Sequence, residues 1–392
     1  MGALARHKGV IAALDKRCRA FLWTTSDRAS GAQCLVAWNY VYGAKREGGL
    51  GVRSLAYQNT CLQVKLQHRL HDALSESWAR WVWSALDGSP IDTVGRSTTI
   101  CGSHWTTVTL LLPLYRAITT VKLGDGHRIS FWLDSWTKFG ALSVSMPKLH
   151  SHCTSPLATV RQVLDRGMRS LLVNRLSLTA ARHLTVLEQT LASVEPSSSP
   201  DSRVLPLCAS PDGKFRSSSL YLLCTSGGEL FTHYAFIWDN GAPSKVKFFA
   251  WLLLQGRIQC RSNLHRKGIL SKEESGCPIC DANLEKLSTS PSTVCSLAVF
   301  GPHLAAEPAR SVSDTPQCPL PPTAPTRSAA TLQLLCLWHL WKHKNGVVFN
   351  GQTPSLATVR KNWWDHAVLW RGRPPPPEWC EDVDTWLTFF TP

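Results

Sequence analysis

The sequence lacks the features that mark several catalytic and membrane protein classes. Its 392 residues contain no Asp-Asp pair, whereas polymerases hold two metal ions with clustered carboxylates. It also has no Gly-rich phosphate-binding loop and no Gly-x-Ser-x-Gly motif. Its longest apolar runs, such as residues 248–254 and 332–341, are well short of the roughly 20 residues that a bilayer requires. We therefore expect a non-enzymatic protein with no membrane span.

Acidic residues are also scarce. Asp and Glu together number 27 against 42 Lys and Arg, which gives a formal net charge of +15. Such a surplus favours polyanionic partners, either nucleic acid or an acidic membrane surface, and charge alone does not choose between them. The first residues do not form a secretory signal, so the 14 Cys are expected to be reduced thiols in an intracellular protein.

The chain has enough apolar mass for buried cores, because 44% of it is hydrophobic and 17 residues are Trp. Apolar residues recur at helical spacing over most of its length. Residues 123–136 differ: a Gly-Asp-Gly turn precedes an alternating apolar pattern, which predicts a short β-hairpin at about 121–136. The predicted fold class is mainly α, with helices expected over residues 1–23, 55–86, 155–194 (two helices), 237–270 and 332–341, and from 359 to about 370.

Several short motifs occur in the order found after the polymerase domain of plant LINE-type (non-LTR) retrotransposon proteins, and the chain resembles the carboxy-terminal portion of that family. They are Phe21-Leu22-Trp23, Val36-Ala37-Trp38, Gly48-Gly49-Leu50-Gly51-Val52, Leu123-Gly124-Asp125-Gly126, Ile237-Trp238, Cys277-Pro278-Ile279-Cys280 and Trp338-His339-Leu340-Trp341. Each motif is short, but the ordered set is specific.

The resemblance and the changes in composition together predict six regions. They are a post-polymerase helical region (1–115), a hairpin with helices (116–196), a reverse transcriptase zinc-binding-like domain (203–287), a disordered linker rich in Pro and Ser (288–330), a helical segment (331–373) and a tail (374–392). The resemblance also implies that the protein is located in the nucleus.

The pair Cys277 and Cys280 has the spacing of a zinc knuckle. The resemblance expects an acidic residue, a His and a distal Cys further on; Glu285 and Cys295 fit, but residues 288–290 contain no His. Two alternatives stay open. Either His303 completes a Cys277, Cys280, Cys295 and His303 zinc site, or the module is a degenerate relic whose cysteines are ordinary thiols.

Basic residues flank the apolar helix predicted around Trp251, a composition that suits phosphate contacts and base stacking. The other interpretation is a solvated cationic face around a buried aromatic core. The candidate nucleic-acid contacts are Lys245, Lys247, Trp251, Arg257, Arg261, Arg266 and Lys267, with the basic helix at residues 6–28 as a second contact.

Three functional hypotheses follow. The first is a retrotransposon-derived, non-catalytic protein that binds RNA or DNA without sequence preference. The second is a protein-interaction module that docks a partner through exposed tryptophans such as Trp251 and Trp341. The third is a decayed retroelement fragment with no selected function.

Overall fold

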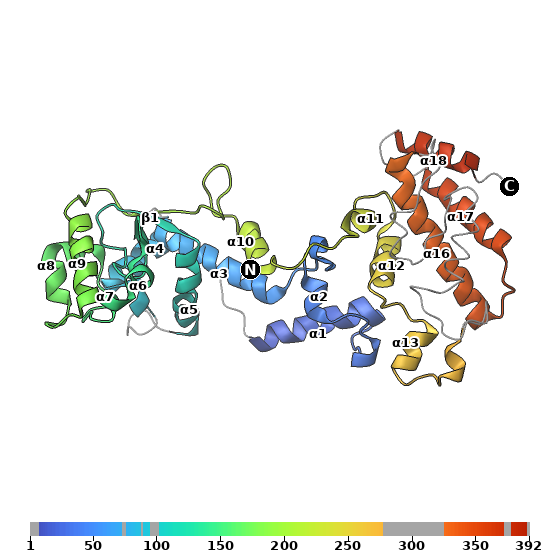
Figure 1. Cartoon of the computed structure of the whole chain (residues 1–392), viewed down its shortest axis with the longest axis horizontal. Coiled ribbons are helices and arrows are strands. Elements are labelled where there is room, and N and C mark those ends of the chain that lie inside the picture. Colours follow the sequence, from blue (N-terminus) through green and yellow to red (C-terminus); the bar gives the residue numbers. More distant parts are fainter. Residues whose placement is uncertain are drawn as a thin grey trace. The chain divides into compact units, whose positions relative to one another are not determined.

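The computed structural model describes residues 8–72, 76–87, 89–94, 102–276, 325–371 and 378–389. The chain divides into two compact units: unit 1 comprises residues 1–20 and 53–227, and unit 2 comprises residues 21–52 and 228–392. Most described elements are helices, and the strands form two small antiparallel sheets (Figure 1). The mainly α-helical class predicted from the sequence is confirmed.

Helix α1 (Lys8–Thr24) begins in unit 1 and ends in unit 2. The other main elements of unit 1 are α3 (Leu55–Asp72), α4 (Ser77–Leu86), α5 (Ser103–Ala117), β1 (Thr120–Lys122), β2 (Ser135–Thr137), β3 (Gly140–Ala141), α6 (Leu142–Ser145), α7 (Pro147–His150), α8 (Val160–Arg166), α9 (Leu178–Leu191), β4 (Ser202–Val204) and α10 (Ser217–Thr225). Those of unit 2 are η1 (Gly31–Gln33), α2 (Trp38–Tyr42), η2 (Lys45–Glu47), α11 (Tyr234–Trp238), α12 (Ser244–Leu254), α13 (Arg261–Arg266), η5 (Glu273–Ser275), α16 (Thr326–Asn350), α17 (Leu356–Arg371) and α18 (Glu378–Phe389).

The two helices predicted over residues 155–194 are α8 and α9, and both begin at a side-chain cap. The Thr159 hydroxyl accepts the backbone N–H of Gln162, and the Ser177 hydroxyl accepts that of Ala180. Each cap satisfies a backbone donor that has no partner in the first helical turn. Sequence-local caps and helical periodicity thus account for both elements.

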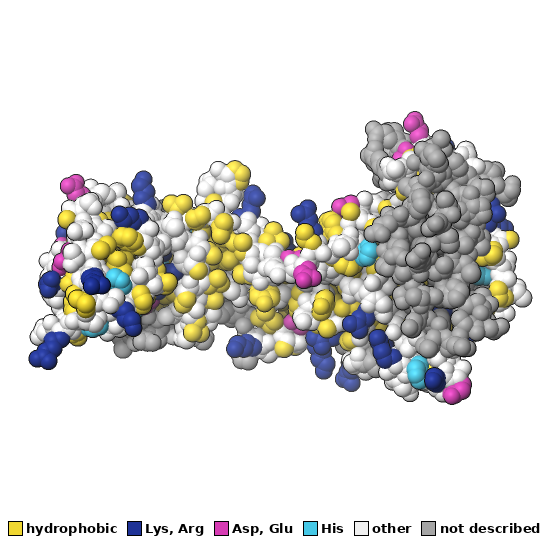
Figure 2. Space-filling model, viewed as in Figure 1, with side chains coloured by type: hydrophobic (Ala, Val, Ile, Leu, Met, Phe, Trp, Pro, Cys, Tyr) yellow, Lys and Arg dark blue, Asp and Glu magenta, His cyan; other side chains and the backbone are white. Residues whose placement is uncertain are grey.

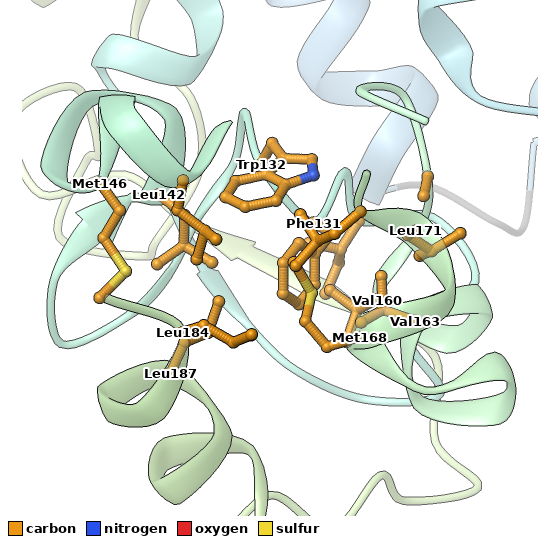
Figure 3. Packing of buried hydrophobic residues seen from close by; sticks show 14 of the residues in the cluster. Phe131, Trp132, Leu142, Met146, Val160, Val163, Met168, Leu171, Leu184 and Leu187 are labelled. Carbon is orange, nitrogen blue, oxygen red and sulfur yellow. The ribbon is translucent and has the colours of Figure 1, made fainter. Parts of the chain in front are cut away.

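One core of unit 1 is centred on the fully buried side chains of Phe131 and Trp132. Their ring centroids lie 5.2 Å apart in a T-shaped arrangement. Figure 3 shows Leu184 and Leu187 of α9 below the two aromatic rings, with residues of α8 beside Phe131. Ser130, Trp132 and Asp134 are buried as well as Ile129 and Phe131, so both faces of the predicted alternating pattern lie in the interior.

The strand pairing differs from the predicted hairpin over 121–136. Strand β1 pairs with β4, about eighty residues later, and β2 pairs with β3 in a short hairpin of its own. The segment between β1 and β2 is instead held by Asp201, next to β4. Its carboxylate accepts backbone N–H bonds from Gly124 (2.8 Å), Gly126 (3.0 Å) and Arg128 (3.1 Å). The Gly-Asp-Gly sequence therefore wraps a buried carboxylate rather than joining two paired strands.

A second buried carboxylate, Asp134, joins α5 to β4. It accepts hydrogen bonds from Arg116 Nε at 3.0 Å and from the backbone N–H of Ser130 at 2.7 Å. Arg203 Nη2 lies 2.9 Å from the same carboxylate, and Arg116 also pairs with Asp92 at 2.8 Å. Buried charges require such partners, so this network has a structural role.

Unit 2 is built around α12, whose apolar residues form a core with α16 and with the early segment of the chain. Val36 and Val41 belong to this core together with Phe249 and Trp251. The paired glycines after α2 allow the close approach that their sequence indicates. Gly48 has a φ of +83°, and a Cβ at Gly49 would clash with the backbone of Gly43.

The region predicted as a tail continues as helix α18. Val383, Trp386 and Leu387 face the core that α18 shares with α16 and α17, and Trp386 is 1% exposed. Asp384 pairs with Arg371 of α17 at 2.7 Å. The i, i+3, i+4 spacing of the three apolar residues explains why helix resumes after the proline run.

The predicted linker over 288–330 lies largely outside the described residues, and α16 begins at Thr326, before its predicted start at residue 331. Within the described parts of the chain, no helix has both the length and the apolar composition needed to cross a bilayer.

Candidate nucleic-acid interface

Trp251 belongs to the core and does not line a surface. Its side chain is 0% exposed, and its indole Nε1 donates a 2.8 Å hydrogen bond to the backbone carbonyl of Gly48. A base cannot stack on a ring that has no accessible face. The sequence-based proposal of Trp251 as a nucleic-acid or protein contact is therefore wrong for this conformation, because basic neighbours in the sequence do not reveal which aromatic residues are buried.

Trp341, the other tryptophan proposed to dock a partner, is partly buried. Its ring lies 5.1 Å from that of Phe249 and 5.3 Å from that of Trp338, measured between centroids. It therefore helps to cover the unit 2 core.

The two lysines of α12 have different environments. Lys247 Nζ donates hydrogen bonds to the backbone carbonyls of Trp238 (2.9 Å) and Asn240 (2.6 Å), which ties α12 to the end of α11. Burial, reinforced by the nearby charge of Lys45, lowers the pKa of Lys247. Lys245 is exposed, with its Nζ 5.4 Å from the Trp338 ring. Of the pair, only Lys245 presents its charge to solvent.

Three of the other candidate cations converge on one cavity of about 400 Å³ in unit 2, which we call the α13 cavity. Its walls come from the segment around η1, the loop between α12 and α13, and the end of α13. The lining residues are Gly31, Cys34, Leu35, Arg257, Gln259, Asn263, Arg266, Lys267 and Ile269.

The backbone that carries these cations is held by short polar contacts. Asn263 Nδ2 donates to the carbonyl oxygens of Gly256 (3.0 Å) and Ile258 (2.7 Å), the residues on either side of Arg257. After α13, the Ile269 backbone N–H donates to the Leu264 carbonyl at 3.0 Å. Both ends of the cavity wall are therefore fixed before any ligand arrives.

The cavity is electrostatically positive. Arg257, Arg266 and Lys267 are all exposed, and among the described residues no carboxylate forms an ion pair with any of them. Figure 2 shows Lys and Arg side chains exposed in the region where Figure 1 draws α13. Cations that lack internal partners are available to an anionic ligand.

Arg261 has a positioning role. Its Nη1 donates to the carbonyl oxygens of Glu274 (3.3 Å) and Gly276 (3.4 Å), which links α13 to the residue directly before Cys277. The predicted zinc ligands Cys277, Cys280, Cys295 and His303 lie outside the described residues. Three thiols and an imidazole have the donor chemistry that zinc prefers. Within the described part of the chain, no group of three or more His, Cys, Asp or Glu side chains is arranged to hold a metal ion.

The second predicted contact, residues 6–28, forms helix α1 over Lys8–Thr24. Lys8, Lys16 and Arg17 are exposed on it. They give this helix a basic surface.

Sequence reasoning missed the neutral residues of the α13 cavity. Leu35, Gln259 and Asn263 line it without any motif to mark them. Only the Asn side chain within a short basic helix is a local signal, because Asn favours hydrogen bonds to nearby backbone over helix propagation.

Comparison with known proteins supports a retroelement relationship. Residues 215–292 match the family described as zinc-binding in reverse transcriptase. A protein of Arabidopsis thaliana, named as a candidate ribonuclease H protein, is 24% identical over 302 residues, which cover 73% of this chain and 46% of that protein. The chain is related to retroelement proteins.

This retroelement-related chain spans about half the length of the curated relative that it matches. The family match contains α11, α12 and α13, and hence most of the α13 cavity. No solved structure gives a significant match. The matched family is zinc-binding, and the described residues of this chain show no metal-binding group.

Proposed function

We propose that this protein is a non-catalytic, retroelement-derived protein that binds RNA or DNA without sequence preference through the α13 cavity and its rim. The observation that carries the proposal is the convergence of Arg257, Arg266 and Lys267 on one concave site, with no described carboxylate paired to them. The missing Asp-Asp pair supports the non-catalytic part.

The chemistry of these side chains suits phosphate. An Arg guanidinium can bind two phosphate oxygens at once, whereas Lys acts as a compact point charge. Contacts of this kind read no base identity, and they release counterions when they form. Affinity should therefore fall steeply as salt rises, with little dependence on sequence.

The proposal keeps the zinc site at Cys277, Cys280, Cys295 and His303 as a structural element, because zinc bound by four side chains stabilises a small module. Within the described residues, Arg261 holds the carbonyls of Glu274 and Gly276. The proposal also includes residence in the nucleus, which follows from the family resemblance.

The test is a salt titration of binding to a fluorescent single-stranded RNA and to a duplex DNA. A triple variant, Arg257→Gln with Arg266→Gln and Lys267→Gln, should weaken binding and lower the magnitude of the salt slope by about 2 for single strands, at roughly 0.7 per lost phosphate contact. The matched control replaces three exposed cations elsewhere, Lys148→Gln with Arg175→Gln and Lys361→Gln. An equal loss of affinity in the two triple variants would refute the α13 cavity as the binding site. Binding that does not depend on salt would refute binding through phosphate contacts.

A further inference from the structure

The α13 cavity is concave and has apolar residues in its lining, which a flat phosphate-binding surface would not need. Its volume of about 400 Å³ falls in the range of small-ligand sites, and Leu35 and Ile269 provide apolar walls. Arg257, Arg266 and Lys267 line the same cavity. A site that combines apolar residues with cations suits a ligand that has both an apolar face and an anionic group.

We infer that the α13 cavity receives one unstacked nucleotide of a single strand, with its phosphate held by Arg257, Arg266 and Lys267 and its base against Leu35 and Ile269. This inference rests on the proposed function and specifies its ligand. Gln259 also lines the cavity, and its amide has both donor and acceptor atoms that suit a base edge.

The argument against duplex binding in the cavity is geometric. In a duplex the bases are stacked and paired inside the helix, so only the outer phosphates could reach the cavity rim. Entry of a base would require its extrusion, which costs unstacking and unpairing energy that a single strand does not pay. The cavity should therefore discriminate by strandedness rather than by sequence.

The site is also formed in advance. Asn263 holds the carbonyls of Gly256 and Ile258, and the His265 ring Nδ1 donates to the Leu270 carbonyl at 2.9 Å. A cavity whose walls are already ordered loses less conformational entropy when a ligand binds.

The test uses the full chain and a variant that fills the cavity while keeping every charge. Gly31 lines the cavity, and a Cβ built on it meets no atom within 4 Å, so Gly31→Leu adds volume without backbone strain. Fluorescence anisotropy would compare a single-stranded oligonucleotide with a blunt duplex of the same sequence, for the wild type, Gly31→Leu and the triple charge variant.

We expect the wild type to bind the single strand at least about tenfold more tightly than the duplex. Gly31→Leu should remove most of that preference, because it weakens single-strand binding far more than duplex binding, whereas the charge variant should weaken both. Equal affinity for the two ligands, or a preference that Gly31→Leu leaves intact, would overturn the inference while the proposed function stands. Absence of salt-dependent binding to either ligand would overturn both.

Discussion

The indole N–H of Trp251 and the backbone carbonyl of Gly48 are 203 positions apart in the sequence and form a 2.8 Å hydrogen bond in the core of unit 2. The same carbonyl accepts a 2.8 Å bond from Gln255 Nε2. Two side chains at α12 and its C-terminal end therefore bind the Gly48 carbonyl and connect this helix to residues 21–52. An aromatic residue that the sequence suggests as a ligand contact serves instead as a structural link.

Replacement of Trp251 should destabilise unit 2. Trp251→Phe retains a large aromatic side chain and removes the indole donor, and we expect a loss of about 1–3 kcal/mol in unfolding free energy. Trp251→Ala should cost about 3–5 kcal/mol because it also leaves a cavity. Urea unfolding measures both, with Trp81→Phe at a 53% exposed position as the control. Wild-type stability in Trp251→Phe would show that the hydrogen bond contributes nothing.

The glycine pair after α2 offers a second test in unit 2. A Cβ at Gly49 would clash with the Gly43 backbone, so Gly49→Ala should lower the unfolding free energy by about 1–3 kcal/mol through overpacking. Gly31→Ala is the matched control, because a Cβ there meets nothing within 4 Å. Denaturation curves that coincide for the two variants would contradict the close approach.

In unit 1, Asp201 should be far more important than its position in a loop suggests. Asp201→Ala leaves the backbone N–H groups of Gly124, Gly126 and Arg128 without their acceptor, at a cost of about 3 kcal/mol or more. Asp212→Ala removes an exposed carboxylate and should change stability by less than about 0.5 kcal/mol. Chemical denaturation distinguishes them, and a neutral Asp201→Ala would refute the role assigned to the carboxylate.

The pair His339 and His366 predicts acid sensitivity. Their ring nitrogens lie 2.9 Å apart between α16 and α17, and burial together with the charges of His366 and Lys342 lowers the pKa of His339 to about 4. Asp365 opposes the lowering of the His366 pKa. Between pH 6.5 and 4 the unfolded chain binds a proton that folded His339 rejects, so stability should fall as pH falls through this window.

The measurement is the melting temperature at pH 7.5 and at pH 5. In His339→Gln the difference between the two values should shrink, because the group that binds a proton only on unfolding is gone. An unchanged difference in the variant would assign the acid sensitivity to other groups.

Metal content tests the zinc-knuckle alternative. If Cys277, Cys280, Cys295 and His303 form the site, purified protein should contain one zinc per chain by mass spectrometry, and Cys277→Ser should lose it. Cys34→Ser, which removes a cysteine outside the predicted set, should retain zinc. A metal-free wild-type protein would favour the degenerate alternative.

Helical elements could be predicted because their signals are local. For α8 and α9, the caps at Thr159 and Ser177 lie directly before the helices, and the apolar spacing lies within them. The pairing of β1 with β4 could not be predicted, because it joins distant segments such as Val121 and Arg203. The contact between Gly124 and the Asp201 carboxylate likewise spans 77 positions. The alternation near Phe131 predicts a hairpin with two different faces, whereas Ser130, Trp132 and Asp134 are buried along with Phe131.

The candidate site was predicted in part for the same reason. Arg257, Arg266 and Lys267 are recognisable as a basic cluster, but the cavity they share also needs Leu35, which belongs to a distant segment. Burial separates Trp251 from these cations, and nothing in the local sequence distinguishes a buried aromatic from an exposed one.

The discontinuous make-up of unit 2 affects how the chain folds during synthesis. Gly48 is synthesised 203 residues before Trp251, an interval of about 10–40 s at 5–20 residues per second. Throughout that interval the apolar residues Val36 and Val41 lack the core they later join. In newly made chains, this segment is therefore accessible to chaperones during that interval. A fragment limited to the family match, residues 215–292, lacks Val36 and Val41 and cannot complete this core.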